Sequence, residues 1–195
     1  MRLVLIRHFQ TLGNLLGRYI GTTDEDLIPE ANQNVTINYP KVEKIYASPL
    51  KRCIQTASIL YPKQDVTLHP DLRECDFGRF ENKNYVELTG DVEYQRWIDS
   101  NGTIPFPEGE SNESFHKRCR SAFETIVGEC IQSGIGTVAL VVHGGTIMSI
   151  LSAFDQQKGS FYDYQVKNGE GYEVYLNEKD WLEGRHLLKV VRKLE

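Results

Sequence analysis

The sequence lacks a long apolar run and an excess of basic residues. Its first apolar run, residues 3–6, is only four residues long and is followed by charge. That is too short for a signal-peptide core or a membrane span. Its 22 lysines and arginines are outnumbered by 27 acidic residues, whereas nucleic-acid-binding proteins usually carry a basic excess. We therefore expect a cytoplasmic protein that binds neither a membrane nor a nucleic acid.

Cysteine is also scarce. The four cysteines, Cys53, Cys75, Cys119 and Cys130, show no CxxC spacing, which argues against a disulfide framework and against a zinc site. We expect free thiols in a reducing compartment. The carboxylates show no clustering at metal-binding spacing either, so we expect neither a metal ion nor another cofactor.

Length and composition indicate one folded domain. At 195 residues, 40 % hydrophobic and 25 % charged, the chain can bury one substantial core. We expect a single domain over residues 1–195 with a small cap-like insertion at about residues 79–110. That insertion ends in the Pro- and Gly-rich segment IPFPEGES, and a loop-rich segment of this kind is suited to cover a substrate.

Strand and helix patterns alternate along the chain. Apolar runs predict strands over residues 3–6, 45–47, 66–68, 138–142, 171–176 and 186–191. Helical spacing predicts helices over 50–61, 112–133 and 145–154, with a short weak helix at 27–38 and short helices within 84–110. Ser48 is the expected N-cap of the first of these helices and Ser111 that of the second. The alternation predicts an α/β fold, a three-layer α/β/α sandwich with a mostly parallel sheet.

Two of the predicted strands end in histidine. Arg7 and His8 follow the first strand, and His143 follows the strand at 138–142. Because ligands bind outside the carboxyl ends of strands in open α/β sheets, both histidines are placed where a site is expected. One such histidine alone is more often a buried core residue, but two together indicate a site. Arg52 lies near the start of a predicted helix, and a helix N-terminus attracts anions.

These residue types suit phosphate chemistry. Two guanidiniums and two imidazoles can hold a phosphate dianion. A histidine with a pKa near 6.5 is largely neutral at pH 7, so one imidazole could accept the phosphoryl group itself. Glu74, in the loop after the third strand, could protonate the leaving alcohol and later activate water. Arg7, Arg52 and His143 would then stabilise charge on the phosphoryl oxygens.

Four segments resemble the motifs of the histidine phosphatase superfamily, which has the phosphoglycerate-mutase-like fold. RHFQT at 7–11 with Asn14 is similar to RHGxTxxN, and SPLKRCIQTA at 48–57 to SxxxRxxxTA. LRECDFG at 72–78 is similar to LxExxxG, and His143 precedes a Gly-rich helix start. The resemblance covers almost the whole chain and follows the order of the family's motifs.

The resemblance implies a phosphohistidine mechanism. It makes His8 the nucleophile and Glu74 the proton donor. We expect this mechanism to need no metal, because the sequence has no carboxylates clustered at metal-binding spacing. The implied phosphate ligands are Arg7, Arg52 and His143, supported by Thr11 and Asn14. We also expect Gly21, Thr22 and Gly144 to contact the substrate.

Three residues leave questions open. Phe9 stands where the family has glycine, and its ring could narrow the pocket, offer a surface to a planar substrate or point away, while its amide could still contact phosphate. Asn82 replaces a glycine found in many relatives, a change for which the sequence offers no physical account. Glu110 is an alternative proton donor.

The remaining histidines have no partner pattern and are expected at the surface: His69, His116 and His186.

The details of several loops resemble the α-ribazole phosphatases, which remove the 5′-phosphate late in cobalamin nucleotide-loop assembly. The resemblance lies in the compact size, the loop GRYIGTTDEDL, the region 94–97 and the segment IPFPEGES. We therefore expect a small phosphorylated substrate, α-ribazole 5′-phosphate, and a monomer or homodimer. Aromatic side chains such as Phe9, Tyr19, Tyr94 or Trp97 could stack on its benzimidazole.

Other activities remain open at this point. A broad-specificity small-molecule phosphatase fits the same residues. A phosphoglycerate mutase is disfavoured because the longer insertions and the ERHYG pattern of the mutases are missing. A non-catalytic phosphate-binding regulatory relative is suggested by Phe9 and opposed by the complete set of expected catalytic residues.

Overall fold

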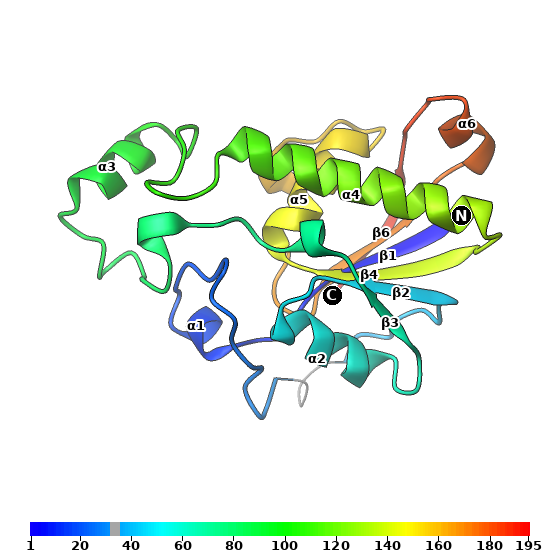
Figure 1. The fold of residues 1–195 in the computed structure, drawn as a ribbon, viewed down its shortest axis with the longest axis horizontal. Helices are drawn as coiled ribbons and strands as arrows, with labels where there is room; N and C mark the ends of the chain where they lie inside the picture. The colour runs from blue at the N-terminus through cyan, green and yellow to red at the C-terminus, as the bar shows by residue number, and fades with distance from the viewer. Residues whose placement is uncertain (32–35) are drawn as a thin grey trace.

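The computed structural model describes residues 1–31 and 36–195, and its centre is a six-stranded sheet (Figure 1). The strand order is β3-β2-β4-β1-β5-β6. The strands are β1 (Arg2–Arg7), β2 (Lys44–Ala47), β3 (Val66–Leu68), β4 (Thr137–Val142), β5 (Gly171–Tyr175) and β6 (Lys189–Leu194). The pairs β1–β4, β2–β4 and β2–β3 are parallel, whereas β5 runs antiparallel to both of its neighbours. The mostly parallel sheet predicted from the sequence is therefore confirmed, with one reversed strand near an edge.

The apolar run of β1 forms the middle of this sheet because it can be buried on both faces. Leu3 and Leu5 belong to the core on one face, and Val4 and Ile6 belong to the core on the other. All four side chains are fully buried. Successive side chains of a strand point to opposite faces of the sheet, and here both faces are covered by a core. Every position in the run is therefore apolar, and none alternates with a polar residue.

Helices cover both faces, which gives the predicted three layers (Figure 1). On one face α2 (Lys51–Leu60) packs Cys53 and Ala57 against the sheet. On the other face lie α4 (Asn112–Gln132), α5 (Gly144–Phe154) and the short α6 (Glu178–Leu182). The side chain of Ser111 caps α4 by accepting from the Ser114 amide at 3.1 Å, as predicted.

A third, smaller apolar cluster lies under the segment expected to be an insertion. It contains Phe80, Leu88 and Phe106, and the α3 helix (Val92–Asp99) packs Trp97 against it. Phe115 at the start of α4 joins the same cluster. This cap, residues 77–110, lies away from the sheet beyond the N-terminal end of α4 (Figure 1).

Several predicted elements differ from the structure. No helix forms in residues 27–31 or 36–38; Leu27 instead makes an isolated bridge with Thr11, and residues 32–35 lie outside the described residues. The Asn- and β-branched-rich sequence has little intrinsic helix preference to oppose this bridge. The strand expected at 186–191 begins only at Lys189. The short helices α1 (Leu12–Leu15) and α6 were not predicted.

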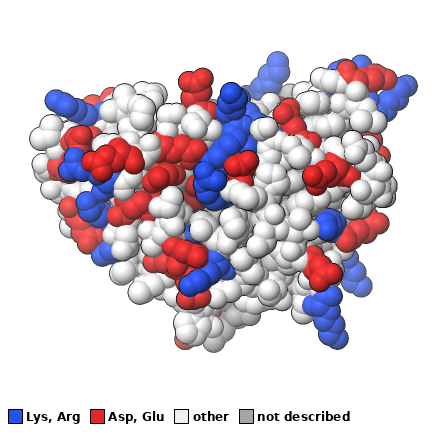
Figure 2. Space-filling view, in the orientation of Figure 1, with Lys and Arg blue, Asp and Glu red and all other residues white. Residues whose placement is uncertain are grey.

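The expectation of free thiols is confirmed. All four cysteines are unpaired and buried, and burial raises the pKa of the Cys119 thiol to about 12. Acidic and basic side chains are interspersed on the face shown in Figure 2. Within residues 1–31 and 36–195, every helix is too short or too polar to cross a bilayer.

Candidate active site

The site lies at the carboxyl ends of β1 and β4. Arg7 is the last residue of β1 and pairs in register with Val142, the last residue of β4. The next residues, His8 and His143, therefore emerge side by side, and their ring centroids are 5.2 Å apart. The backbone amide of His8 donates to the Val142 carbonyl at 2.9 Å, which fixes the chain at this point.

His8 is held in one tautomer. Its Nδ1 lies 2.6 Å from the carbonyl oxygen of Phe9, and because a carbonyl only accepts, Nδ1 carries the proton. Nε2 then bears the lone pair. Burial and the nearby charges of Arg52 and Arg7 hold the pKa of His8 well below its usual value. His8 is therefore a neutral imidazole with a free nucleophilic nitrogen.

His143 has the opposite arrangement. Its Nδ1 accepts from Nε of Arg52 at 3.3 Å, so the proton lies on Nε2, which is 2.8 Å from Oγ of Ser48. Burial and the Arg52 charge lower the pKa of His143 well below its usual value. Ser48, which the sequence predicts as the N-cap of α2, therefore binds His143 instead. The N-cap residue of α2 is Leu50, whose side chain makes no capping hydrogen bond.

Arg52 is fully buried in the first turn of α2. Its guanidinium donates to the carbonyl oxygens of Thr23 at 2.7 Å and Gly21 at 2.8 Å. A Cβ at Gly21 would lie 1.9 Å from the Cys75 carbonyl oxygen, so only glycine fits there. In the structure Gly21 supports Arg52, and the exposed Thr22 donates its amide to Glu81. Neither residue lines the cavities described below.

Glu81 is a residue that the sequence analysis missed. Its carboxylate accepts from the amides of Gly21, Thr22 and Thr23 and from the Thr23 hydroxyl at 2.7 Å. It also accepts from the Phe77 amide at 3.2 Å. One carboxylate therefore holds both the loop that binds Arg52 and the start of the cap.

Arg7 extends over the N-terminus of α5. Its Nη1 donates to the Val166 carbonyl at 2.6 Å, whereas its buried Nε has no partner in the described structure. A Cβ at Gly144 would lie 3.5 Å from that Nε. The missing side chain at Gly144 leaves room beside the guanidinium for a bound anion.

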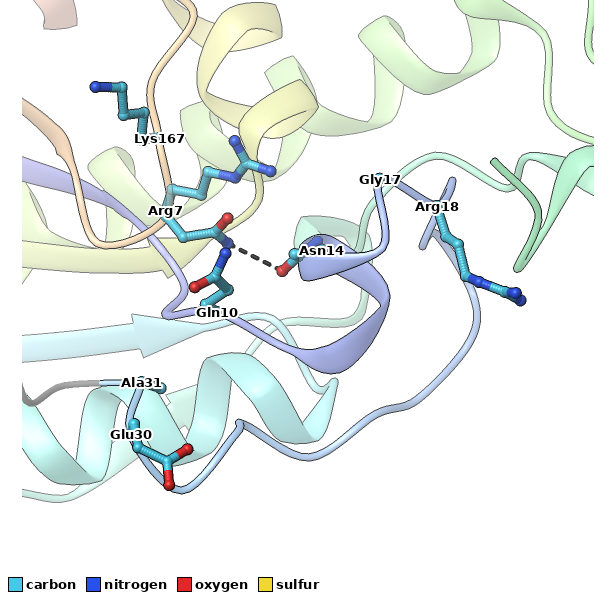
Figure 3. Close-up of a pocket in the computed structure, with 9 residues that line it drawn as sticks. Arg7, Gln10, Asn14, Gly17, Arg18, Glu30, Ala31 and Lys167 are labelled. Atoms are coloured by element: carbon cyan, nitrogen blue, oxygen red, sulfur yellow. Dashed lines mark hydrogen bonds between the residues drawn. The ribbon is translucent and has the colours of Figure 1, made fainter. Parts of the chain in front are cut away.

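Thr11 and Asn14 form the capping box of α1. Asn14 Oδ1 accepts from the Thr11 amide at 3.2 Å. It also accepts from Nδ2 of Asn168 at 3.0 Å, the hydrogen bond that is dashed in Figure 3. Its own amide group therefore remains available as a donor. Asn168, which the sequence gave no reason to single out, also donates to the His8 carbonyl at 3.0 Å.

The side of Arg7 near Asn14 opens into a polar cavity of about 680 Å³. Gln10, Asn14, Lys167 and Asn168 line it with Arg7. The side chains of Lys167 and Arg18 extend away from Arg7 (Figure 3), and Arg18 is paired with Glu87 at 2.9 Å. Arg7 is therefore the cation placed to bind an anion at the base of this cavity.

Glu74 faces the same region from the loop after β3. Its two oxygens accept from the amides of Cys75 at 3.0 Å and Gly145 at 3.1 Å. Burial raises the pKa of Glu74 above its usual value, although both amides and the charges of Arg52 and Arg7 oppose this. A carboxyl group in this setting keeps its proton to a higher pH than a solvent-exposed carboxyl group does.

The alternative acid, Glu110, is occupied. Nε and Nη2 of Arg118 donate to its two oxygens at 2.8 and 2.7 Å. The same guanidinium donates to the carbonyl of Glu74 at 2.8 Å and to that of Arg73 at 2.7 Å. Glu110 therefore anchors Arg118, which in turn holds the loop that carries Glu74.

The structure answers both questions about the replaced glycines. The ring of Phe9 is buried against Gly169, where a Cβ would lie 3.1 Å from the ring, and it lines neither cavity. Its amide donates to Oγ1 of Thr56 at 2.9 Å and is not free for phosphate. Asn82 has φ of 56°, a left-handed conformation that asparagine tolerates better than most residues.

On its other side Arg7 borders a second cavity of about 500 Å³. Glu74, Gly144 and Gly145 also line this end of it. Most of the remaining wall is aromatic or apolar and comes from the loop after α1, the cap, α4, α5 and the segment after α5: Tyr19, Phe77, Trp97, Phe106, Phe115, Met148, Phe161, Tyr162 and Val166. His116 also lines this cavity, so the expectation that it is a simple surface residue was wrong. Tyr94 stacks behind Trp97 instead of lining the cavity.

The remaining two histidines make local contacts. His69 accepts from the Asp71 amide at 3.3 Å, and His186 stacks on Trp181 with ring centroids 4.3 Å apart. Within the described ranges, no three His, Cys, Asp or Glu side chains are arranged to hold a metal ion.

Comparison with known proteins agrees with this arrangement. The family model of the histidine phosphatase superfamily (branch 1) matches residues 3–186. "Putative phosphoserine phosphatase 2" of Hydrogenobacter thermophilus is 33 % identical over 160 residues, which cover 77 % of this chain and 76 % of that protein. Broad-specificity phosphatase YOR283W of Saccharomyces cerevisiae is 30 % identical over 164 residues, covering 77 % and 69 %.

A solved structure, the α-ribazole phosphatase of Shigella flexneri, matches with a TM-score of 0.77 and 21 % identity, covering 100 % of this chain and 96 % of that chain. At that identity the match supports the fold alone. The family model, by contrast, spans nearly the whole chain, including both histidines and the loop of Glu74. The chain belongs to the histidine phosphatase superfamily.

Proposed function

We propose that the chain hydrolyses phosphate monoesters with a neutral, planar leaving group through a phosphohistidine at His8. The observation that carries this proposal is the position of Glu74. A carboxyl group with a raised pKa lines the end of the aromatic cavity that Arg7 also borders. A leaving group in that cavity would have its ester oxygen beside an acid that can protonate it.

In the first step Nε2 of His8 attacks phosphorus. A P–N bond forms, the P–O bond to the leaving group breaks, and Glu74 gives its proton to the departing oxygen. The guanidiniums of Arg7 and Arg52 and the amide of Asn14 stabilise charge on the other phosphoryl oxygens. His143 was expected to be a phosphate ligand, but both of its ring nitrogens are occupied, and it acts by holding Arg52 through Nδ1. The Nδ1–H group of His8 continues to donate to the Phe9 carbonyl oxygen, so the ring keeps its orientation.

In the second step water enters the position that the alcohol has left. Glu74, now a carboxylate, takes a proton from the water as its oxygen attacks phosphorus. The P–N bond breaks and its electron pair returns to Nε2 of His8. Inorganic phosphate and the original protonated Glu74 result, so the cycle closes without a further reactant.

The lining of the aromatic cavity favours a leaving group without charge. Arg7 is the single Lys or Arg among its described lining residues, and that guanidinium is needed for the phosphate. A carboxylate on the leaving group, as in a phosphoglycerate or phosphoserine, would therefore have no cation of its own. Tyr19, Trp97 and Phe106 suit a planar ring instead.

α-Ribazole 5′-phosphate, a benzimidazole riboside, fits this description and is our proposed substrate. The competing proposal is a broad-specificity small-molecule phosphatase, which the similarity to the yeast broad-specificity phosphatase favours. Both use the same catalytic residues. They differ in whether the aromatic wall contributes binding energy for one leaving group.

The test compares kcat/KM for α-ribazole 5′-phosphate, ribose 5-phosphate, phosphoserine and 3-phosphoglycerate. We expect α-ribazole 5′-phosphate to be preferred by about a hundredfold or more, because its ring fills the cavity. Values within a few-fold of one another across the four esters would support the broad-specificity enzyme. No hydrolysis of any ester by the wild-type protein would contradict both proposals.

A further inference from the structure

Helix α4 presents two neutral polar side chains to the mostly aromatic and apolar wall of the 500 Å³ cavity, which Asn101, Thr103 and Gln165 also line. Asn112 and His116 are four residues apart at the start of this helix, so they lie on the same face. Both line the cavity, and neither has a part in the proposed phosphoryl transfer.

Asn112 offers a hydrogen-bond acceptor. Its Nδ2 donates to the carbonyl oxygen of Gly102 in the cap. Because a carbonyl can only accept, this contact fixes which end of the amide faces the cap. Oδ1 has no hydrogen-bond partner within the described residues and is the group left for a ligand.

His116 offers one ring nitrogen. Its Nδ1 lies 2.9 Å from Oγ of the buried Ser149 on α5, and its ring packs edge-on against Phe161 with centroids 4.9 Å apart. These contacts from two other elements fix the ring, and Nε2 has no partner in residues 1–31 and 36–195. Burial and the charge of Arg120 lower the pKa of His116, so the imidazole is neutral at pH 7.

We propose that Asn112 and His116 bind hydroxyl groups of the leaving group, so that the cavity selects a hydroxylated planar alcohol such as a riboside. This inference rests on the proposed phosphatase function and adds the groups that recognise the alcohol. A hydroxyl can donate to Oδ1 of Asn112 and can donate to or accept from Nε2 of His116. A carboxylate would face an acceptor at Asn112 and no added positive charge at His116.

The energetic reason is the cost of unpaired polar groups. When a planar leaving group displaces water from the cavity, Oδ1 and Nε2 lose their solvent hydrogen bonds. A hydroxylated ligand replaces them, whereas an analogue without hydroxyls leaves both groups unpaired. Between a hydroxylated ligand and an analogue with the same ring but no hydroxyls, the difference in affinity should therefore come from the hydroxyls.

The experiment compares α-ribazole 5′-phosphate with its 2′,3′-dideoxy analogue. The two esters share the same ring and the same scissile bond and differ only in the two hydroxyls. We expect the wild type to prefer the hydroxylated ester by about tenfold or more in kcat/KM. His116→Phe keeps an aromatic ring against Phe161 and should reduce this preference to about threefold or less, mainly by slowing the hydroxylated ester. Asn112→Ala should also reduce the preference, and His116→Gln should restore part of it.

Lys117→Ala is the matched control. Lys117 is the next residue of α4, is exposed and lines an outer groove rather than this cavity. It should leave the preference unchanged. A preference that stays the same in His116→Phe and Asn112→Ala, or equal losses for both esters, would overturn the inference.

A binding experiment separates this inference from the proposed function. Calorimetry with the unphosphorylated α-ribazole and its dideoxy analogue needs no catalysis. Tighter binding of the hydroxylated compound, lost in His116→Phe, supports the inference even if no ester is hydrolysed. Equal binding of the two compounds by the wild type contradicts it even if the phosphatase activity is present.

Discussion

Arg118 binds both carboxylate oxygens of Glu110, with Nε–Oε1 and Nη2–Oε2 distances of 2.8 and 2.7 Å. The pair is nearly buried, with the two side chains 11 % and 13 % exposed. Since the same guanidinium donates to the backbone of Glu74, an ion pair outside the cavity positions the proposed acid. Such bidentate, partly desolvated pairs are geometrically strict.

Glu110→Gln should lower kcat by about tenfold, because Arg118 loses its charged anchor and the Glu74 loop can shift. KM should change little, and the pH profile should keep its shape. If Glu110 were the proton donor, this variant would instead abolish the alkaline limb of the profile. Arg73→Ala, which removes an exposed pair with Asp71, is the control and should be neutral.

The pH dependence of kcat/KM should be bell-shaped. Activity requires a neutral His8, whose pKa is lowered, and a protonated Glu74, whose pKa is raised. Activity should therefore rise as the pH rises through the His8 pKa, below 6.5, and fall as the pH rises through the Glu74 pKa, above its usual value. Glu74→Gln should lose the alkaline limb.

Glu74→Gln should also depend on the leaving group. The parameter to compare is kcat/KM, because it reports the first step alone and not the later hydrolysis, in which Glu74 acts as the base for every ester. For an alkyl ester such as a ribose phosphate, kcat/KM should fall by about 10²- to 10⁴-fold, because the departing alkoxide is not protonated. For 4-nitrophenyl phosphate, whose 4-nitrophenolate group leaves without being protonated, the loss should be about tenfold or less. A uniform loss across both esters would mean that Glu74 is not the acid.

His8→Ala should remove turnover by at least about 10³-fold, because no other described side chain replaces the free Nε2. The wild type, mixed with a ³²P-labelled ester and quenched in base, should retain label that acid releases. The variant should retain none. Label on the variant, or undiminished turnover, would end the assignment of His8 as nucleophile.

The placement of Arg7, His8 and His143 could be predicted because it follows from a local rule. Each lies at the end of a strand that is apolar enough to be central or directly after it, and the carboxyl ends of parallel neighbours meet at one edge. The helix α4 could be predicted from its buried stripe and its Ser111 cap. These signals lie within a few residues of the features that they predict.

The partners of the site residues could not be predicted in this way. Asn168 contacts His8 from 160 residues away, and Arg118 contacts Glu74 from 44 residues away. A single asparagine or arginine has no local pattern that indicates which distant backbone group it binds. The same limit explains the error at residues 27–31, where a bridge to Thr11 determines the structure, and at Ser48, which has the sequence of a helix cap.

Ser48→Ala distinguishes the two roles of that serine. The structure pairs its hydroxyl with Nε2 of His143 at 2.8 Å, so the variant should lower kcat/KM by about tenfold through loss of the fixed tautomer. The free energy of unfolding should change by less than about 1 kcal/mol. If Ser48 acted as a helix cap, stability would fall and activity would be retained.

Phe9→Gly restores the residue typical of the family and should separate stability from catalysis. The Phe9 ring is 1 % exposed and packs against Gly169, so its removal leaves a cavity and should lower the free energy of unfolding by about 3–5 kcal/mol. The ring lines neither cavity, and the amide that donates to Thr56 is retained. At a temperature where the variant stays folded, kcat/KM should therefore remain within about threefold of wild type for every ester.

Chemical unfolding followed by circular dichroism measures the first effect, and steady-state kinetics on the folded protein measures the second. Leu15→Ala, at a position that is 54 % exposed, is the control, because it removes an apolar side chain that is not buried in the core. A tenfold or larger gain in kcat/KM for Phe9→Gly would show that the ring restricts the phosphate site after all. A selective loss for α-ribazole 5′-phosphate would show that the ring contributes to binding the benzimidazole.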